Sequence, residues 1–133
     1  MKIEVTFDGK KKVNANINGF VISTDQPVEG GGDGSAPSPF DLFLASLATC
    51  AGIYVKGFCD QRGIPAEGIS LFQDMEYDQE TQLIKKVNIE IQVPADFPEK
   101  YLDALIAVAG KCKVKKHMQH PPEFNVFTSV KNN

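Results

Sequence analysis

The stretch Ser38–Cys50, Ser-Pro-Phe-Asp-Leu-Phe-Leu-Ala-Ser-Leu-Ala-Thr-Cys, opens like a helix and ends on a cysteine inside the most apolar run of the chain. A serine such as Ser38 can accept hydrogen bonds from the first N–H groups of a helix, and Pro39 suits the first helical position. Asp41 brings a carboxylate to the positive end of the helix dipole and can reach back to the cap. The apolar residues that follow, through Val55, predict a helix buried on most of its surface.

This helix is expected to run from Ser38 to Arg62, because Gly63 suits a C-terminal cap and Pro65 prevents continuation. Its length, about 25 residues, is roughly twice that of an average helix. So long and apolar a helix needs cover on several sides. We expect a sheet to cover one side and a partner subunit to cover another.

The length of 133 residues predicts one domain, 1–133, with a real core. A net charge of −3 gives no reason to expect nucleic acid as a partner. The alternating residues Met1–Asp8 do not resemble a signal peptide, and the apolar run Leu42–Val55 is too short to span a bilayer. We therefore expect a cytoplasmic protein that does not use a membrane. Three cysteines make a structural disulfide framework improbable in such a compartment.

Three short strands are predicted before the helix, because apolar residues alternate between two hairpin signals, Asp8-Gly9 and Asn18-Gly19. They cover Met1–Phe7, Lys11–Ile17 and Phe20–Thr24. The stretch Gln26–Pro37 is rich in Gly, Pro, Asp and Ser. It could suggest a phosphate cradle, but no lysine follows and the strand–loop–helix spacing is missing. A flexible entry loop is the expected structure.

After the helix, alternation predicts two strands, Glu67–Tyr77 and Leu83–Val93. Helical spacing follows in Tyr101–Ala109, a short helix is expected over Cys112–Gln119, and Phe124–Val130 alternates like a final strand. The order of strands, helix, strands, helices and strand is typical of an α+β fold with helices packed on antiparallel sheets.

Cys50 and Cys59 both lie on the long helix, about half a turn apart around its axis. Cys50 has an apolar neighbourhood and is either a small buried hydrophobe or a functional thiol. Cys59 has polar neighbours towards the helix end, and we expect it to have no role.

Cys112 stands among lysines, in Lys111-Cys112-Lys113-Val114-Lys115-Lys116, where one helix stops and another begins. A helix N-terminus and ammonium groups both lower a thiol pKa, which predicts a reactive cysteine. The alternative is a solvated lysine face that contains a cysteine. His117 and His120 could complete three metal ligands, but structural zinc takes four, so no metal site is expected.

The run Ser38–Cys50 resembles the central-helix signature of the OsmC/Ohr family. Two further features support the resemblance: Cys112 followed by Val114 at a second helix start, and the order of the elements. The segment Gly63–Gly68 resembles the linker that leads this family back into its sheet. The resemblance covers nearly the whole chain.

The resemblance implies an intertwined homodimer of α+β subunits, with antiparallel sheets wrapped around the long central helices. It also implies a thiol-dependent peroxidase without a cofactor, active in organic hydroperoxide resistance and oxidative-stress defence. Cys50 matches the peroxidatic cysteine, whose thiolate attacks the hydroperoxide and becomes a sulfenic acid. Cys112 matches the resolving cysteine, and an external thiol reductant would reduce the disulfide. Phe40, Phe43 and Phe58 are candidate walls for the apolar part of a small organic hydroperoxide.

The sequence departs from the family pattern at its charged positions. Family peroxidases place an arginine near the cysteine and a glutamate after the helix-opening proline, whereas Arg62 is the sole arginine here and Phe40 follows Pro39. Asp41 is one residue late and suits a capping role, and one of the lysines at 10–12 could supply charge in place of the arginine. These departures favour an OsmC-like branch that lacks the usual charged residues. They also motivate a second hypothesis, a non-catalytic dimer that binds a small apolar ligand.

Overall fold

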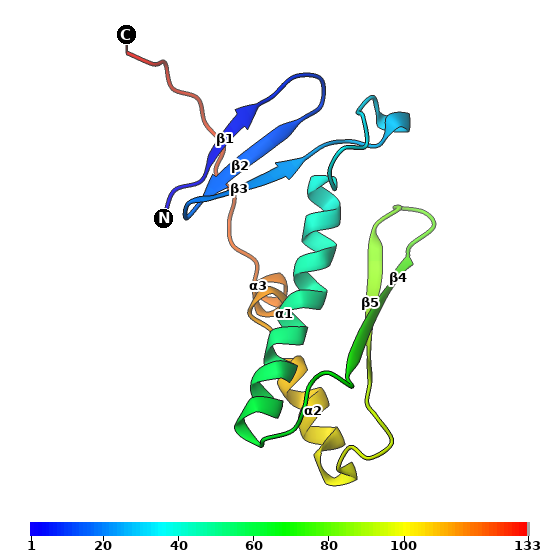
Figure 1. Cartoon of the computed structure of the whole chain (residues 1–133). Helices are drawn as coiled ribbons and strands as arrows, with labels where there is room; N and C mark the ends of the chain where they lie inside the picture. Colours follow the sequence, from blue (N-terminus) through cyan, green and yellow to red (C-terminus); the bar gives the residue numbers. More distant parts are fainter. Residues whose placement is uncertain (133) are drawn as a thin grey trace. The chain divides into compact units, whose positions relative to one another are not determined.

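A computed structural model describes residues 1–132 (Figure 1). In chain order its elements are β1 (Glu4–Phe7), β2 (Val13–Ile17), β3 (Phe20–Thr24), η1 (Val28–Gly30), α1 (Pro39–Gln61), β4 (Ser70–Tyr77), β5 (Ile84–Gln92), η2 (Glu99–Tyr101), α2 (Leu102–Ala109) and α3 (Lys113–Gln119). The chain forms two compact units, one of residues 1–47 and one that starts at residue 48. The expected α+β class is confirmed, with small antiparallel sheets and a long helix.

The first unit holds an antiparallel sheet in the order β1-β2-β3. Both predicted hairpins are present. The turn between β2 and β3 consists of Asn18 and Gly19, whose φ angles of 49° and 83° lie in the left-handed region. Residues that tolerate this region are what a two-residue hairpin turn requires, so the local sequence sets this turn.

One face of the β1-β2-β3 sheet is apolar and open to solvent. The register places Val5 opposite Ala15 and Ala15 opposite Ile22, so these side chains share a face. At its two ends the same face carries Phe7 and Phe20, which are 83% and 72% exposed. Exposed apolar surface of this extent is typical of a contact with another molecule.

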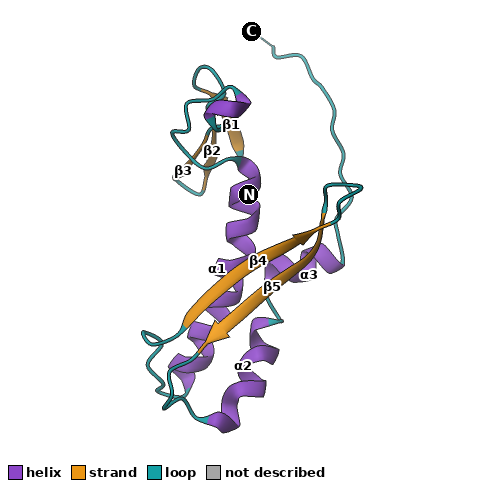
Figure 2. Cartoon of the chain, turned by 90° about the vertical axis from the view of Figure 1, so that its right-hand side faces the viewer, coloured by secondary structure: helices purple, strands orange, loops and turns teal. Residues whose placement is uncertain are grey.

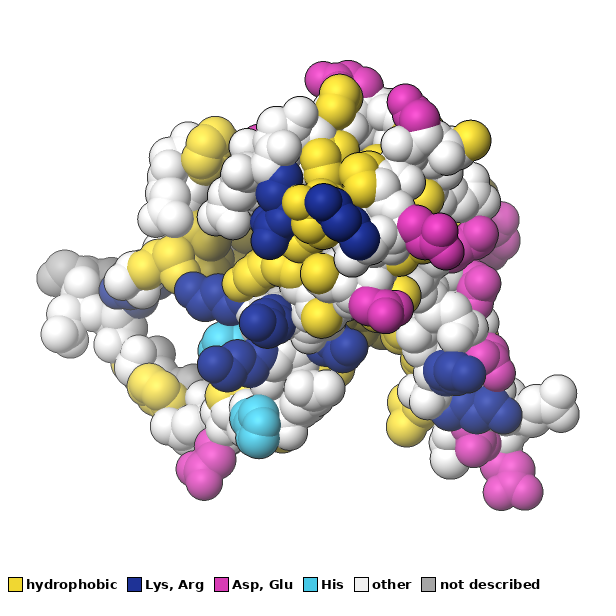
Figure 3. Space-filling view, turned by 90° about the horizontal axis from the view of Figure 1, so that it is seen from below, with side chains coloured by type: hydrophobic (Ala, Val, Ile, Leu, Met, Phe, Trp, Pro, Cys, Tyr) yellow, Lys and Arg dark blue, Asp and Glu magenta, His cyan; other side chains and the backbone are white. Residues whose placement is uncertain are grey.

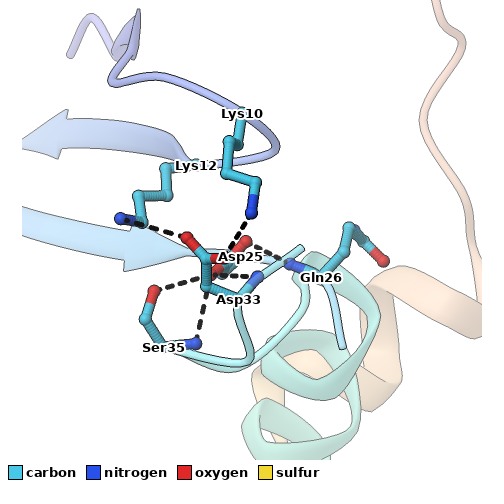
Figure 4. Close-up of polar contacts among 6 residues, drawn as sticks. All are labelled: Lys10, Lys12, Asp25, Gln26, Asp33 and Ser35. Atoms are coloured by element: carbon cyan, nitrogen blue, oxygen red, sulfur yellow. Dashed lines mark hydrogen bonds and ion pairs between the residues drawn. The ribbon is translucent and has the colours of Figure 1, made fainter. Parts of the chain in front are cut away.

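The loop after β3 is organised around Asp25 (Figure 4), whose side chain is fully buried. Its carboxylate accepts hydrogen bonds from the backbone N–H groups of Gln26, Asp33 and Ser35 and from the Ser35 hydroxyl, at 2.6–3.3 Å. Asp33 in turn forms ion pairs with Lys10, at 2.6 Å, and with a second lysine of the first hairpin. The predicted loop is present, but a buried carboxylate holds it in one arrangement.

The start and end of α1 follow the sequence signals. The Ser38 N–H donates to the Asp41 carboxylate at 3.1 Å, and the Asp41 N–H donates to the Ser38 hydroxyl at 3.2 Å. This reciprocal pair is a capping box. At the other end Gly63 has a φ of 64°, and the Ile64 N–H donates to the Cys59 carbonyl, which closes the last turn. The predicted bounds are correct to within one residue.

The second unit packs the β4-β5 hairpin, the last turns of α1 and helix α2 around one core (Figure 2). In the hairpin, the register pairs Leu71 with Ile91 on the face that packs against this core. The buried core residues are Val55, Phe58, Cys59, Phe97 and Leu105. The strands are slightly shorter than predicted, which is usual for element ends.

The prediction of a strand over Phe124–Val130 is wrong for this chain, because residues 121–132 contain no helix or strand. The apolar side chains of the segment are almost fully exposed, and Val126 is 95% exposed. A strand forms only where a neighbouring strand accepts its hydrogen bonds. The sequence therefore alternates as a strand does, but no neighbouring strand pairs with residues 124–130 in the described chain.

Helix α1 is less covered than expected. Ala51 and Val55 are buried, but Phe40 and Ile53 are more than half exposed. By length and composition alone α1 could cross a membrane, a test that the core helix of a soluble protein also passes. With 23 residues, α1 is longer than the apolar run Leu42–Val55 that it contains.

Candidate functional site: a pair of thiols

Two of the three cysteines, Cys50 and Cys112, lie side by side in the second unit. Cys50 lies in the middle of α1 and is half-buried, whereas the Cys112 side chain is only 2% exposed. Their side chains are in hydrogen-bonding contact, and both thiols are free. The two residues are 62 positions apart in the sequence. Cys112 is the N-cap of α3. The start of α3 lies against Cys50, and this places the two thiols together.

The cap of α3 is a sulfur cap. The Cys112 sulfur accepts a hydrogen bond from the Lys115 N–H at 3.5 Å, and the Lys116 N–H bonds the Cys112 carbonyl at 3.0 Å. The first N–H groups of a helix have no partner within the helix. Those of Lys113 and Val114 favour the Cys50 thiolate and so lower its pKa. The start of α3 therefore serves both thiols.

The pKa of Cys50 lies below the ordinary thiol value. Burial alone raises this pKa, but the Cys112 thiol, the N–H groups of Val114 and Lys113, and the Lys113 charge all stabilise the thiolate. Together these contacts outweigh burial, as hydrogen bonds to a charged form do. The half-exposed sulfur is thus the one favoured as a nucleophile.

The expectation of a lowered pKa at Cys112 is wrong. Burial is the largest influence on Cys112 and raises its pKa, and the contact with Cys50 raises it further. The N–H groups of Lys115 and Val114 act in the opposite direction without reversing the result. The N–H groups at the start of α3 favour both thiolates, but the pKa is lowered overall only at Cys50.

Cys59 is also differently placed from the prediction. Its side chain is fully buried in the core rather than in polar surroundings, and burial raises its pKa. Buried structural cysteines are unreactive, so the absence of a role for Cys59 stays a prediction.

The charged groups around the thiols differ from the sequence candidates. Lys113 is the cation whose charge acts on Cys50, and it was not among the charged partners predicted from the sequence. Lys10 and Lys12, considered as substitutes for the arginine, form ion pairs with Asp33 in the first unit. Arg62 donates to the Phe58 carbonyl at 3.2 Å and stacks on the Phe58 ring.

The candidate pocket walls do not form one group. Phe40 and Phe43 stack on each other at the start of α1, with ring centroids 5.6 Å apart. Phe58 is a core residue that meets the Tyr101 ring edge-on. Phe58 also lines a cavity between α1 and α2, whereas Phe40 and Phe43 do not line that cavity.

Lysines and both histidines are grouped around α3. Figure 3 shows the two histidine side chains on the same face as a group of Lys and Arg side chains. The His117 ring nitrogen contacts the Lys113 carbonyl at 2.8 Å. Within residues 1–132, no three His, Cys, Asp or Glu side chains are arranged to hold a metal ion.

The arrangement can carry out two-electron thiol chemistry. A half-exposed sulfur with a stabilised thiolate is a nucleophile, and a second thiol in contact with it can close a disulfide. The sequence contained one usable signal for the Lys113 contribution. Its place in the first turn of a predicted helix puts Lys113 near any thiol that contacts the start of that helix. The local sequence does not show that this thiol is Cys50.

The chain matches one family model and several solved structures. The family model "OsmC-like protein" matches residues 32–127. A crystal structure from Psychrobacter arcticus, provisionally named an osmotic stress induced and detoxification response protein, is 25% identical, with a TM-score of 0.73 over 87% of this chain and 86% of that one. An OsmC-like protein from Mycoplasma pneumoniae is 14% identical, with a TM-score of 0.70 over 90% of this chain and 87% of that one.

Some neighbours carry a functional name. An organic hydroperoxide resistance protein from Legionella pneumophila is 19% identical, with a TM-score of 0.58 over 90% of both chains. Among curated proteins, none matches this sequence. Because the family model spans well over half of the sequence and includes both thiols of the pair, the chain belongs to the OsmC-like protein family.

Proposed function

We propose that the protein is a cytoplasmic thiol-dependent peroxidase that reduces organic hydroperoxides in oxidative-stress defence. The observation that carries the proposal is the contact between Cys50 and Cys112, with a stabilised thiolate on the more exposed sulfur. Residues 1–133 act as a single OsmC-like domain in this proposal. Neighbours named for organic hydroperoxide resistance support the choice of substrate class.

The reaction uses the two thiols in order. The Cys50 thiolate attacks the outer oxygen of the hydroperoxide, which yields an alcohol and a Cys50 sulfenic acid. Cys112 then attacks the sulfenic sulfur, and a disulfide forms with loss of water. An external thiol reductant restores both cysteines by exchange. Lys113 takes the role of the cation that the family supplies with arginine, because its charge acts on Cys50.

The test is peroxide consumption with a dithiol reductant in excess. The wild-type protein should consume cumene hydroperoxide catalytically, and Cys50→Ser should abolish this consumption. Cys59→Ser is the matched control, because it changes a free thiol of the same helix that lies outside the pair. Equal consumption by wild type and Cys50→Ser would refute the proposal and favour the non-catalytic ligand-binding hypothesis.

The protein is further proposed to act as a homodimer. The apolar face of the β1-β2-β3 sheet is open, and the alternating segment 124–130 exposes Phe124, Val126 and Val130. Both β1 and β3 are edge strands. An extended segment can add to such an edge through backbone hydrogen bonds, so a second copy of the chain can cover both surfaces.

A pair of tail variants tests the dimer. Val126→Glu places a charge among the apolar side chains, whereas Asn125→Glu places it on the alternate side of the same segment. Sedimentation equilibrium should give a dimer for wild type and Asn125→Glu and a weakened dimer for Val126→Glu. A wild-type monomer at micromolar concentration, or equal behaviour of both variants, would contradict the proposal.

A further inference from the structure

The contact between the two thiols has a direction. Cys50 is half-buried and open to an approaching peroxide, whereas Cys112 is only 2% exposed, and burial disfavours the charged thiolate there. The hydrogen bond therefore runs from the Cys112 S–H to the Cys50 sulfur. The reacting sulfur carries a proton donor at its side before any peroxide arrives.

This arrangement leaves a difficulty for the second step. A resolving cysteine attacks as a thiolate, yet Cys112 is 2% exposed and holds its proton. The first step has the opposite need. When the O–O bond of an alkyl hydroperoxide breaks, the departing oxygen leaves as an alkoxide, which is strongly basic and requires a proton.

We infer that Cys112 is the general acid of the peroxide step as well as the resolving nucleophile. The inference rests on the proposed peroxidase function and adds a catalytic role at the same site. The thiol that contacts the reacting sulfur passes its proton to the alkoxide oxygen, and this transfer creates the thiolate that resolution needs.

In the first step a bond forms between the Cys50 sulfur and the distal peroxide oxygen, the O–O bond breaks, and the alkoxide takes the Cys112 proton. The Cys50 sulfur is oxidised by two electrons and the hydroperoxide is reduced to an alcohol. In the second step the Cys112 thiolate attacks the sulfenic sulfur, the S–S bond forms, the S–O bond breaks, and hydroxide leaves to become water.

Lys113 is the competing proton source near Cys50. Its backbone N–H and its side-chain charge favour the Cys50 thiolate, whereas the side-chain hydrogen bond to that sulfur comes from Cys112. The geometry therefore assigns the proton to Cys112 and leaves Lys113 as an electrostatic aid to the thiolate.

Two oxidants with different leaving groups separate proton donation from thiolate stabilisation. Cumene hydroperoxide releases an alkoxide, which needs a proton, and 3-chloroperbenzoic acid releases a carboxylate, which does not. Single-turnover rate constants are measured with both for wild type, Cys112→Ala, Cys112→Ser and Lys113→Gln. The thiolate fraction of Cys50 enters both rate constants equally, so it cancels in their ratio.

General acid catalysis contributes about 10²–10⁴-fold. Both Cys112 variants should therefore lose at least about 100-fold in rate with cumene hydroperoxide and change less than about tenfold with the peracid. A serine hydroxyl can donate a hydrogen bond but is a much weaker acid than a thiol, so Cys112→Ser should behave like Cys112→Ala. Lys113→Gln should slow both oxidants by the same factor. Retained reaction with the peracid shows that each variant is folded at Cys50.

Three results would overturn the inference: equal losses with both oxidants in Cys112→Ala, full rescue by Cys112→Ser, or a loss confined to cumene hydroperoxide in Lys113→Gln. These outcomes differ from failure of the proposed function itself. In that case the wild-type protein would react with neither oxidant at a rate above that of a free thiol.

Discussion

Replacing Gly32 with alanine is expected to destabilise the first unit, because the loop around Asp25 has no room for a side chain there. A Cβ at position 32 would overlap the Gln26 carbonyl oxygen and lie 2.6 Å from the Asp25 Oδ1. Ordinary contacts start at 3.4 Å, so the carboxylate oxygen would have to retreat by about 0.8 Å. That oxygen accepts the Gln26 N–H, and the Gln26 carbonyl accepts the Gly34 N–H.

Overpacking of a closely packed site costs about 1–3 kcal/mol, and each displaced hydrogen bond about 1 kcal/mol. The free energy of unfolding should therefore fall by at least about 2 kcal/mol. The unfolding entropy of a chain of this size is about 0.28 kcal/mol/K, so the melting temperature should drop by about 7 °C.

Urea unfolding and thermal melts at one protein concentration measure the effect. Gly30→Ala is the matched control in the same loop, because its Cβ would meet its nearest neighbours at ordinary distances of 3.6–3.7 Å. The control should change the unfolding free energy by no more than about 0.5 kcal/mol. A Gly32→Ala protein as stable as the control would refute the reasoning about this loop.

Other expectations follow from the same contacts. As the pH rises, iodoacetamide should label Cys50 first, below the ordinary thiol pKa of 9.0, and label Cys112 and Cys59 later. Mass spectrometry of the alkylated peptides measures this order, and labelling of Cys112 before Cys50 would contradict it. The Asp25 pKa is lowered from 3.8 to about 2, so its stabilisation is fully present above pH 3.8 and is lost as the pH falls through about 2. Asp25→Asn should lower the urea midpoint at neutral pH and flatten its decline in acid, and an unchanged acid profile would count against the carboxylate network. Leu105→Ala should cost about 2–5 kcal/mol in urea unfolding, because this core side chain is 1% exposed; a loss under about 1 kcal/mol would contradict the described core.

Local signals predicted the parts of the fold that local chemistry determines. The turn at Asn18 and Gly19 and the bounds of α1 depend on conformations and caps that neighbouring residues set by themselves. The strand over Phe124–Val130 depends on a distant partner strand, so its alternation alone could not place it. The loop after β3 was predicted as a loop, but the burial of Asp25 depends on partners eight and ten residues away.

The thiol pair shows the same division. The resemblance named Cys50 and Cys112 together, while local reasoning predicted a lowered pKa for Cys112 from its helix start and its lysines. Burial reversed that prediction, because desolvation depends on what packs around the sulfur. The amides of Lys113 and Val114 act on Cys50, a residue of another helix. Such an effect across elements is visible in the structure and hidden in the sequence.

The most direct test of the central claim is to locate the sulfur bond after a single turnover. The reduced protein is treated with one equivalent of cumene hydroperoxide, the remaining thiols are alkylated, and the digest is analysed by mass spectrometry. We predict one equivalent of cumyl alcohol, a disulfide between Cys50 and Cys112, and an alkylated Cys59. Recovery of both Cys50 and Cys112 as alkylated thiols, with the peroxide unconsumed, would contradict the proposed peroxidase reaction.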